Sequence, residues 1–105
     1  MDNNKILSYL GLCRKAGKLV CGTALTVDAI RRNKAVLAVT CSDASGNTKK
    51  RVSDACSYRS VDYASLPCTC AELGAALGQS GTTAAAGITD KSFSDMIKKL
   101  LQTSL

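Results

Sequence analysis

The sequence contains no histidine and no tryptophan, and only four of its 105 residues are aromatic, three Tyr and one Phe. Without an imidazole the usual general base is missing, and a cysteine nucleophile would have no partner to activate it. The glycine-rich loops G-x-G-x-x-G and G-x-x-x-x-G-K-[ST], which hold nucleotide phosphates, are also absent. The eight acidic residues form no local pair for acid–base chemistry. These absences argue against an enzyme.

The sequence also lacks a long apolar run. No stretch approaches the roughly 20 apolar residues that span a membrane. The first residues, MDNNKILSYLGL, have an Asp before the first Lys and no small-residue cleavage site. We therefore expect a cytoplasmic protein with no membrane partner. With no linker or repeat in a chain of this length, the sequence predicts a single domain over residues 1–105.

Six cysteines raise the question of disulfides or a metal site. Disulfides are not expected without an export signal. Zinc sites use paired C-x-x-C or Cys/His spacings, whereas this chain has no His and one close pair, Cys68-Thr69-Cys70. We expect no metal and no cofactor, and we expect most cysteines to be small core residues; a metal- or redox-active role is a remote alternative. The six are Cys13, Cys21, Cys41, Cys56, Cys68 and Cys70.

The positive charge is concentrated in one half of the chain. The net charge is +6, and residues 1–59 hold eleven Lys and Arg against four Asp and Glu, while residues 60–105 hold three against four. A one-sided distribution is typical of a single surface that faces a polyanion. A charge that serves only solubility is the alternative. For the run Lys49-Lys50-Arg51 we favour a solvated helix face over a binding role.

The apolar pattern predicts helices and strands in the order αβαβαβαβα, which indicates a four-stranded sheet between helical layers. Asn3 or Asn4, Thr69 and Asp90 are candidate helix caps, and Gly17 ends the first helix. The inward residues predicted for the second helix are Leu25, Ala29 and Ile30, and those for the last helix are Phe93, Met96, Ile97, Leu100 and Leu101. The predicted strands span residues 19–21, 35–41, 61–66 and 83–88.

The stretch from Gly11 to Lys34 holds six of the fourteen Lys and Arg residues and three of the eight glycines. It predicts a helix, a turn carrying Lys18, a short strand, and a second helix that begins at Gly22 and Thr23. A helix that begins directly after a strand presents unpaired backbone N–H groups, and phosphate is the natural ligand in basic surroundings. The stretch therefore indicates RNA binding, although a simple strand-to-helix turn would also explain Gly22.

Three segments carry a resemblance to a known family: LGLCRKAGKLVCGTALTVDAIRR, AVLAVTCSDASGNTKKRV and GITDKSFSDMIKKLL. Together they make the chain similar to the kink-turn-binding ribosomal-protein family, and in particular to its bacterial YlxQ-like members. The resemblance covers nearly the whole chain and is weakest over residues 58–72. It implies an α/β fold, a three-layer αβα sandwich around a four-stranded mixed sheet. It also implies binding of structured RNA, with no cofactor and no catalysis.

The resemblance also implies where RNA is bound. In the family, RNA contacts the loop from the first strand into the second helix, the first turns of that helix, and a loop before the last strand. We expect Lys18, Arg31 and Arg32 to supply phosphate charge around these segments. The positions carried over to this chain are Gly22, Thr23, Ala24, Leu25 and Asp28, followed by Gly81, Thr82, Thr83 and Ala84.

Three of these positions depart from the family pattern. Kink-turn binders have a polar or basic residue, then Glu or Gln, and then Lys, where this chain has Ala24, Leu25 and Asp28. Ala and Leu cannot hydrogen-bond base edges, and an Asp facing phosphates would cost about 1–2 kcal/mol. The chain therefore binds RNA through its backbone and nearby basic residues, binds a different ligand, or has lost tight binding.

Two hypotheses about partners follow. The favoured one is a non-enzymatic, monomeric protein that binds structured RNA, with ribosomal RNA as one candidate, and no small-molecule substrate. The second is a protein–protein adaptor on the same scaffold, in which Ala24, Leu25 and the small-residue loop 81–87 form an apolar docking surface.

Overall fold

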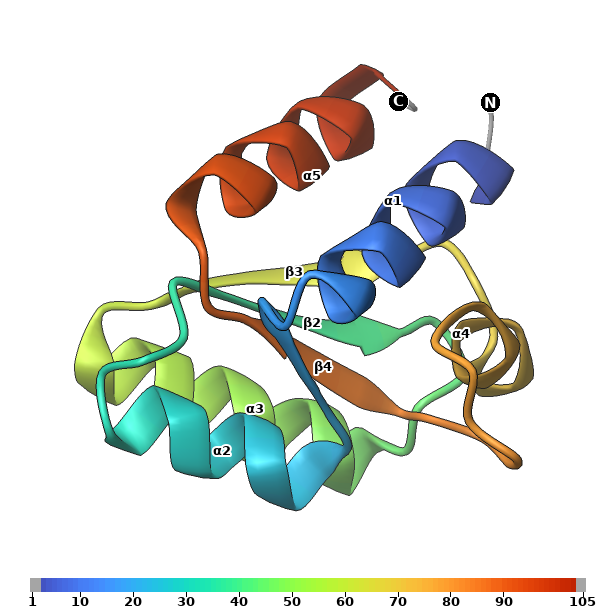
Figure 1. Cartoon of the computed structure of the whole chain (residues 1–105). Helices are drawn as coiled ribbons and strands as arrows, with labels where there is room; N and C mark the ends of the chain where they lie inside the picture. Colours follow the sequence, from blue (N-terminus) through green and yellow to red (C-terminus); the bar gives the residue numbers. More distant parts are fainter. Residues whose placement is uncertain (1–2, 104–105) are drawn as a thin grey trace.

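A computed structural model describes residues 3–103 of the chain, with side chains described for residues 5–101. Within these residues, helices and strands alternate in the predicted order, helix first (Figure 1). The predicted cap at Asn3 or Asn4 lies outside the described side chains. The elements are α1 (Asn3–Lys15), β1 (Leu19–Cys21), α2 (Thr23–Arg31), β2 (Leu37–Cys41), α3 (Gly46–Arg59), β3 (Asp62–Leu66), α4 (Cys70–Ala76), β4 (Ala85–Ile88) and α5 (Lys91–Thr103).

The four strands form one mixed sheet in the order β1-β4-β2-β3. β2 and β3 are parallel, and β4 is antiparallel to both β1 and β2. β2 lies in the interior of the sheet and is buried along its whole length, as the apolar run predicts. The expected α/β architecture with a mixed four-stranded sheet is therefore confirmed.

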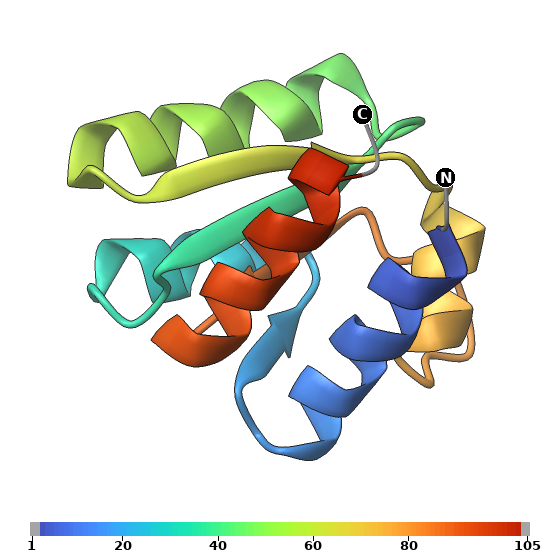
Figure 2. The ribbon, with the colours of Figure 1, turned by 90° about the horizontal axis from the view of Figure 1, so that it is seen from above.

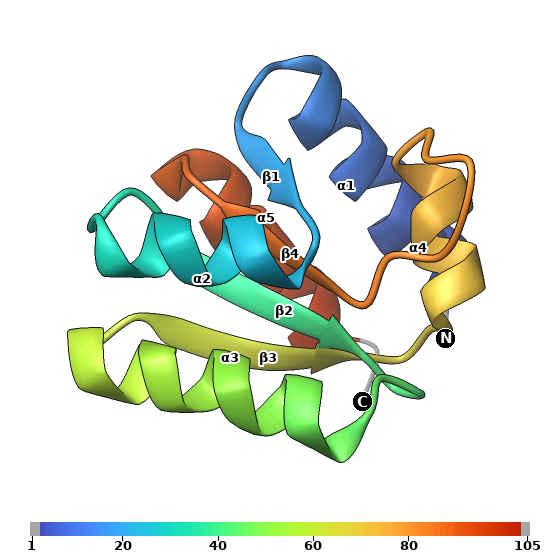
Figure 3. The ribbon, with the colours of Figure 1, turned by 90° about the horizontal axis from the view of Figure 1, so that it is seen from below.

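The helices form a layer on each face of the sheet. α2 and α3 cover one face (Figure 3), whereas α1 and α5 cover the other (Figure 2). α4 packs beside α1. Each layer has its own core, one around Val27, Ile30 and Val52, the other around Leu10, Leu73 and Ile97. This arrangement is the three-layer sandwich that the resemblance implies.

The small residues of β4 allow α2 to approach the sheet closely. A Cβ placed on Gly87 would lie 3.1 Å from Cγ2 of Val20 and 3.7 Å from Cα of Thr26. An added Cβ would therefore crowd the Val20 side chain of β1, and it would meet α2 at ordinary van der Waals distance. The glycine therefore allows β1 and α2, which meet at the candidate site, to pack closely against β4.

Local signals placed most helix ends correctly. The Thr69 hydroxyl accepts the Glu72 amide and the Glu72 carboxylate accepts the Thr69 amide, which completes a capping box. The Phe93 amide donates to the Asp90 carboxylate at 3.1 Å. Gly17, with a φ of 74°, follows the end of α1. The predicted caps Thr69 and Asp90 and the stop at Gly17 are confirmed.

Two strands begin two residues later than the sequence predicts. β2 begins at Leu37 rather than at residue 35, because the Ala35 amide donates to the Ala29 carbonyl of α2. β4 begins at Ala85 rather than at residue 83, because the Thr83 amide donates to the Cys70 carbonyl of α4. In both cases the preceding helix takes the hydrogen bonds that would have extended the strand.

Two inward-facing predictions were wrong. Leu25 is 58% exposed and Met96 is 41% exposed. The residues that face the core, Thr26 in α2 and Ile97 in α5, come one position later, and one position turns a helix by about 100°. In α2 a threonine therefore occupies the core position, and its hydroxyl has no partner among the described residues.

The cysteines are largely core residues, as predicted. All six are free thiols, and Cys13, Cys41, Cys56 and Cys68 are buried. Burial raises the pKa of the Cys13 and Cys56 thiols to about 11, so neither is a nucleophile near neutral pH. Among the described residues, no helix is both long and apolar enough to cross a membrane.

Candidate nucleic-acid interface

The end of β1 and the start of β4 meet at one end of the sheet. These strands are antiparallel, with Cys21 opposite Ala86, and the Gly22 amide donates to the Ala85 carbonyl at 2.9 Å. Residues 22–25 and 81–84, sixty positions apart in sequence, are thereby brought to the same end of the sheet (Figure 3). We call these two segments the sheet-end site.

Gly22 has a backbone conformation that favours glycine. Its φ is 95°, and a Cβ at this position would meet nothing within 4 Å. Strain in the backbone, not crowding inside the protein, therefore explains the glycine. The open space beside it leaves room for a ligand backbone to approach.

The N-terminus of α2 is not capped by a side chain. Gly22 is the N-cap residue, and it accepts the Thr26 amide through its backbone carbonyl. The first turn of α2, from Thr23 to Leu25, is thus available to accept an anion, and the helix dipole favours negative charge there. The side chains of Ala24 and Leu25 are exposed on this turn.

Hydrogen bonds from Cys41 hold the loop before β4 in place. The Thr83 carbonyl accepts the Cys41 thiol at 3.2 Å, and the Ala84 carbonyl accepts the Cys41 amide at 3.1 Å. Thr83 itself is buried, so its side chain faces the core and not a ligand. Gly81 and Thr82 are exposed, and they are the outer part of the loop.

Asp28 has a partner that offsets its charge. Its carboxylate forms an ion pair with Arg32 at 3.1 Å, one helical turn further along α2, and both side chains are more than half exposed. Such an exposed pair contributes only about 0.3–0.5 kcal/mol to stability. Its main consequence here is electrostatic, because it weakens the repulsion that a bare Asp would exert on phosphate.

The basic residues expected at this site lie elsewhere. Lys18 precedes β1, about 13 Å from Gly22 at 3.3 Å per extended residue, and its carbonyl accepts the Thr89 amide at the far end of the sheet. Arg31 and Arg32 lie at the C-terminal end of α2. The structure therefore does not bring these three residues to the sheet-end site.

Two basic residues lie nearer to the site and were not among the predicted contacts. The Lys49 ammonium donates to the Ser42 carbonyl at 2.8 Å, directly after β2, where the strand meets Ala84. Arg14 donates to the Leu77 carbonyl. The Arg14 charge also acts on the last residue of β1, because it opposes the rise that burial causes in the pKa of the Cys21 thiol.

Comparison with known proteins identifies the family. Residues 4–98 match the ribosomal protein L7Ae/L30e/S12e/Gadd45 family. The chain belongs to this family. It is 36% identical to the RNA-binding protein YlxQ of Enterococcus faecium over 101 residues, covering 96% of this chain and 95% of the relative. It is 37% identical to the RNA-binding protein YlxQ of Bacillus subtilis (strain 168), covering 96% of this chain and 99% of that one.

Solved structures show the same fold. A Bacillus halodurans protein of unknown function superposes with a TM-score of 0.86 at 30% identity, covering 93% of this chain and 97% of the other. The Giardia lamblia 15.5kD RNA binding protein superposes with a TM-score of 0.74 at 20% identity, covering 92% and 82%. These likenesses support the L7Ae/L30e-type architecture described above.

Three cysteines of this L7Ae/L30e-family chain lie beneath the loop of the sheet-end site. A hydrogen bond from Cys41 lowers the pKa of the Cys68 thiol, and hydrogen bonding to Cys68 raises the pKa of Cys41. The Cys70 amide donates to the Asp43 carboxylate at 2.8 Å, which lowers the pKa of Asp43. Within residues 3–103, no cluster of three or more His, Cys, Asp or Glu side chains has an arrangement that could hold a metal ion. The loop itself is held by the Cys41 thiol, which donates to the Thr83 carbonyl, and by the Cys70 carbonyl, which accepts the Thr83 amide.

The two parts of the predicted site thus have different outcomes. Sequence and family pattern identified residues 22–25 and 81–84, which the structure brings together. Within the predicted set, however, the Asp28 side chain pairs with Arg32, and the Thr83 side chain is buried in the core. They did not identify the nearby charges of Arg14 and Lys49. A signal was present for Lys49, which lies in the first turn of a helix that, like α2, begins where a strand ends.

Proposed function

We propose that this chain is a non-enzymatic RNA-binding protein that recognises structured, kink-turn-like RNA at the sheet-end site. The observation that carries the proposal is the hydrogen-bonded junction of Gly22 with Ala85, which sets an uncapped helix N-terminus beside an exposed loop. RNA-binding relatives that cover nearly the whole chain support it. Within the proposal the ligand is structured RNA, with ribosomal RNA as one candidate, and it is bound by a cytoplasmic monomer of one domain.

The chemistry of the site fits phosphate better than base edges. Backbone amides of the first turn of α2 donate hydrogen bonds, and Ala24 and Leu25 offer none from their side chains. Lys49 and Arg14 add positive charge near the site, in addition to the more distant Lys18, Arg31 and Arg32. Recognition of this kind depends on RNA shape, because phosphate contacts carry no sequence information.

Binding to a kink-turn RNA and to a straight duplex, each at two salt concentrations, tests the proposal. We expect tighter binding to the kinked RNA and a loss of affinity with salt, since each phosphate contact releases a counterion. Lys49→Glu should weaken binding by roughly tenfold, and Lys91→Glu, an exposed change on the opposite layer, should not. Equal binding to both RNAs, or equal effects of both variants, would contradict the proposal.

A second candidate function is a protein–protein adaptor. The exposure of Leu25, beside exposed Ala24 in the first turn of α2, favours it. Leu25→Gln separates the two candidates: an adaptor would lose its protein partner, whereas RNA held by backbone amides would be retained. Solution mass and pull-down with wild type and this variant provide the measurement. A strict monomer that recovers no protein would remove the adaptor function.

Ribosome association is a finer part of the proposal. Co-sedimentation of the protein with ribosomal subunits at low and moderate salt tests it directly. We expect protein in the ribosomal fraction and less of it for Lys49→Glu. Protein that stays at the top of the gradient for wild type would limit the function to free RNA.

A further inference from the structure

A basic groove lies on the outer side of the α2–α3 layer, away from the sheet-end site. It has a volume of about 490 Å³ and lies between the C-terminal end of α2 and the middle and C-terminal part of α3. Of its residues, only Arg31 belongs to the predicted RNA contacts. The lining consists of Arg31, Arg51, Asp54, Ala55, Tyr58 and Arg59.

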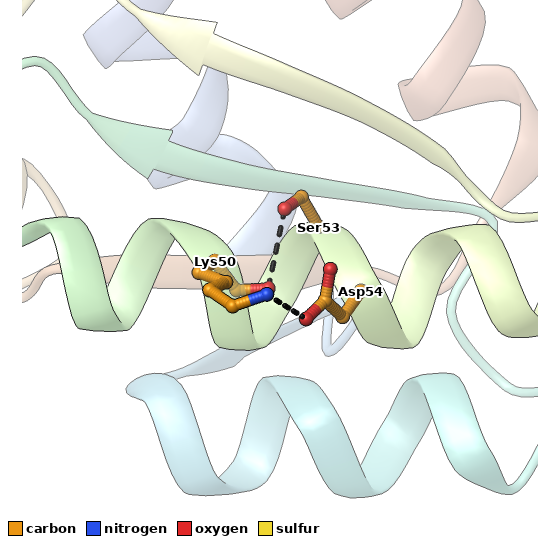
Figure 4. Close-up of polar contacts among 3 residues, drawn as sticks. All are labelled: Lys50, Ser53 and Asp54. Atoms are coloured by element: carbon orange, nitrogen blue, oxygen red, sulfur yellow. Dashed lines mark hydrogen bonds and ion pairs between the residues drawn. The ribbon is translucent and has the colours of Figure 1, made fainter.

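The charge of this groove favours an anion. Asp54 is its acidic residue, and the carboxylate is paired with the Lys50 ammonium at 3.1 Å (Figure 4). Within the part of the chain that the structure describes, the guanidinium groups of Arg31 and Arg51 form no ion pair. The C-termini of two helices contribute about half a negative charge each. The combined positive charge of the three arginines is larger than these negative charges.

Tyr58 gives the groove a feature that a plain anion site lacks. Its side chain is 83% exposed, and the Arg59 guanidinium carbon lies 5.6 Å from the centroid of its ring. An aromatic face exposed beside arginines is the arrangement on which unpaired bases stack in single-stranded nucleic acid complexes. A free phosphate or an acidic peptide would make no use of the ring.

We propose that the α2–α3 groove is a second RNA-binding surface, in which the arginines hold phosphates and Tyr58 stacks on one unpaired base. The inference rests on the proposed function, because it takes RNA as the ligand. α3 has fourteen residues and begins near the sheet-end site. At 1.5 Å per residue the groove residues from Arg51 to Arg59 therefore lie roughly 8–20 Å along α3 from that end, a distance that about two to six stacked nucleotides cover.

Two RNAs test the proposal: a kink-turn with short arms, and the same kink-turn with eight-nucleotide single-stranded extensions on both strands. Fluorescence anisotropy gives the affinity of wild type for each RNA at several salt concentrations. The extended RNA should bind about tenfold more tightly, with a salt slope larger by roughly one to two. Equal affinity for the two RNAs would overturn the proposal.

Variants show whether the groove causes the tighter binding of the extended RNA, which we call the affinity gain. Tyr58→Ala and the double change Arg51→Glu with Arg59→Glu should abolish the gain and leave binding of the short RNA unchanged. The matched control, Lys91→Glu with Lys99→Glu, alters two exposed charges on α5. It should retain the gain. Groove variants that keep the gain would contradict the proposal, and their thermal melts would establish that they are folded.

Two further outcomes separate this inference from the proposed function. If wild type bound no kink-turn RNA, the proposed function would fail, and a single-stranded oligonucleotide would test the groove alone: binding lost in Tyr58→Ala supports it, and no binding overturns it. If polyglutamate bound as tightly as that oligonucleotide and Tyr58→Ala had no effect, the groove would be assigned to an acidic partner. That result would also overturn the inference.

Discussion

Gly74→Ala is a substitution in α4 that should disturb the RNA site without changing any of its residues. A Cβ on Gly74 would lie 3.2 Å from the Gly81 carbonyl carbon and 3.2 Å from Thr82 Cα, and closer still to the Gly81 oxygen. Unstrained contact requires about 3.5 Å or more between carbons. The loop of the sheet-end site would have to move outward by about 1 Å.

The magnitude follows from two opposing effects. Ala favours the helical backbone over Gly by up to about 1 kcal/mol. Overpacking of a buried position costs about 1–3 kcal/mol. We expect a net loss of about 1–2 kcal/mol in the free energy of unfolding, which lowers Tm by roughly 5–15 °C in a domain of this size. RNA affinity should fall as well, because Gly81 and Thr82, the exposed part of the loop, would be displaced.

Thermal unfolding and kink-turn RNA binding measure both effects. Gly46→Ala is the matched control, since its added Cβ meets nothing within 4 Å and Gly46 has no positive φ. This control should be neutral or slightly stabilised. If Gly74→Ala were as stable as Gly46→Ala and bound RNA like wild type, the close approach of α4 to the loop would be refuted.

Three other predictions follow from particular contacts. Thr26→Val removes a buried hydroxyl that has no partner among the described residues. It should therefore raise the free energy of unfolding by up to about 1 kcal/mol. A drop in Tm would indicate that the hydroxyl has a partner. Asp28→Asn removes a negative charge beside the proposed phosphate path, so RNA affinity should rise at low salt, and this increase should become smaller at high salt. No change in affinity at either salt concentration would place the RNA away from Asp28. The pKa of Asp43 is lowered below 3.8 by hydrogen bonds from Cys70, so its contribution to stability is present above that pH and is lost as the pH falls through the folded-state pKa. Asp43→Asn should therefore unfold with a weaker pH dependence in acid than wild type, and identical acid profiles would contradict this assignment.

The sequence predicted those features of the fold that have local causes. Thr69 and Asp90 cap helices because a side-chain oxygen reaches an amide three residues away, and this spacing is visible in the sequence. The order of helices and strands follows from apolar periodicity in the same way. Family pattern added the two halves of the sheet-end site, which no local signal would have joined.

Features that depend on the tertiary arrangement were missed. The rotation of α2 depends on its packing against the sheet, where Thr26 and not Leu25 is buried. The positions of Lys18 and Arg31 depend on strand and helix direction, which places them away from Gly22 despite their closeness in sequence. Lys49 lies near the site only because β2 is antiparallel to β4.

The central claim, that residues 22–25 and 81–84 form one RNA-contacting surface, is tested most directly by amide chemical shifts. A titration of isotope-labelled protein with unlabelled kink-turn RNA reports each backbone N–H separately. We predict the largest shifts at Gly22, Thr23 and Thr82, with small shifts on α5. Large shifts confined to residues outside both segments, or none at saturating RNA, would contradict the account.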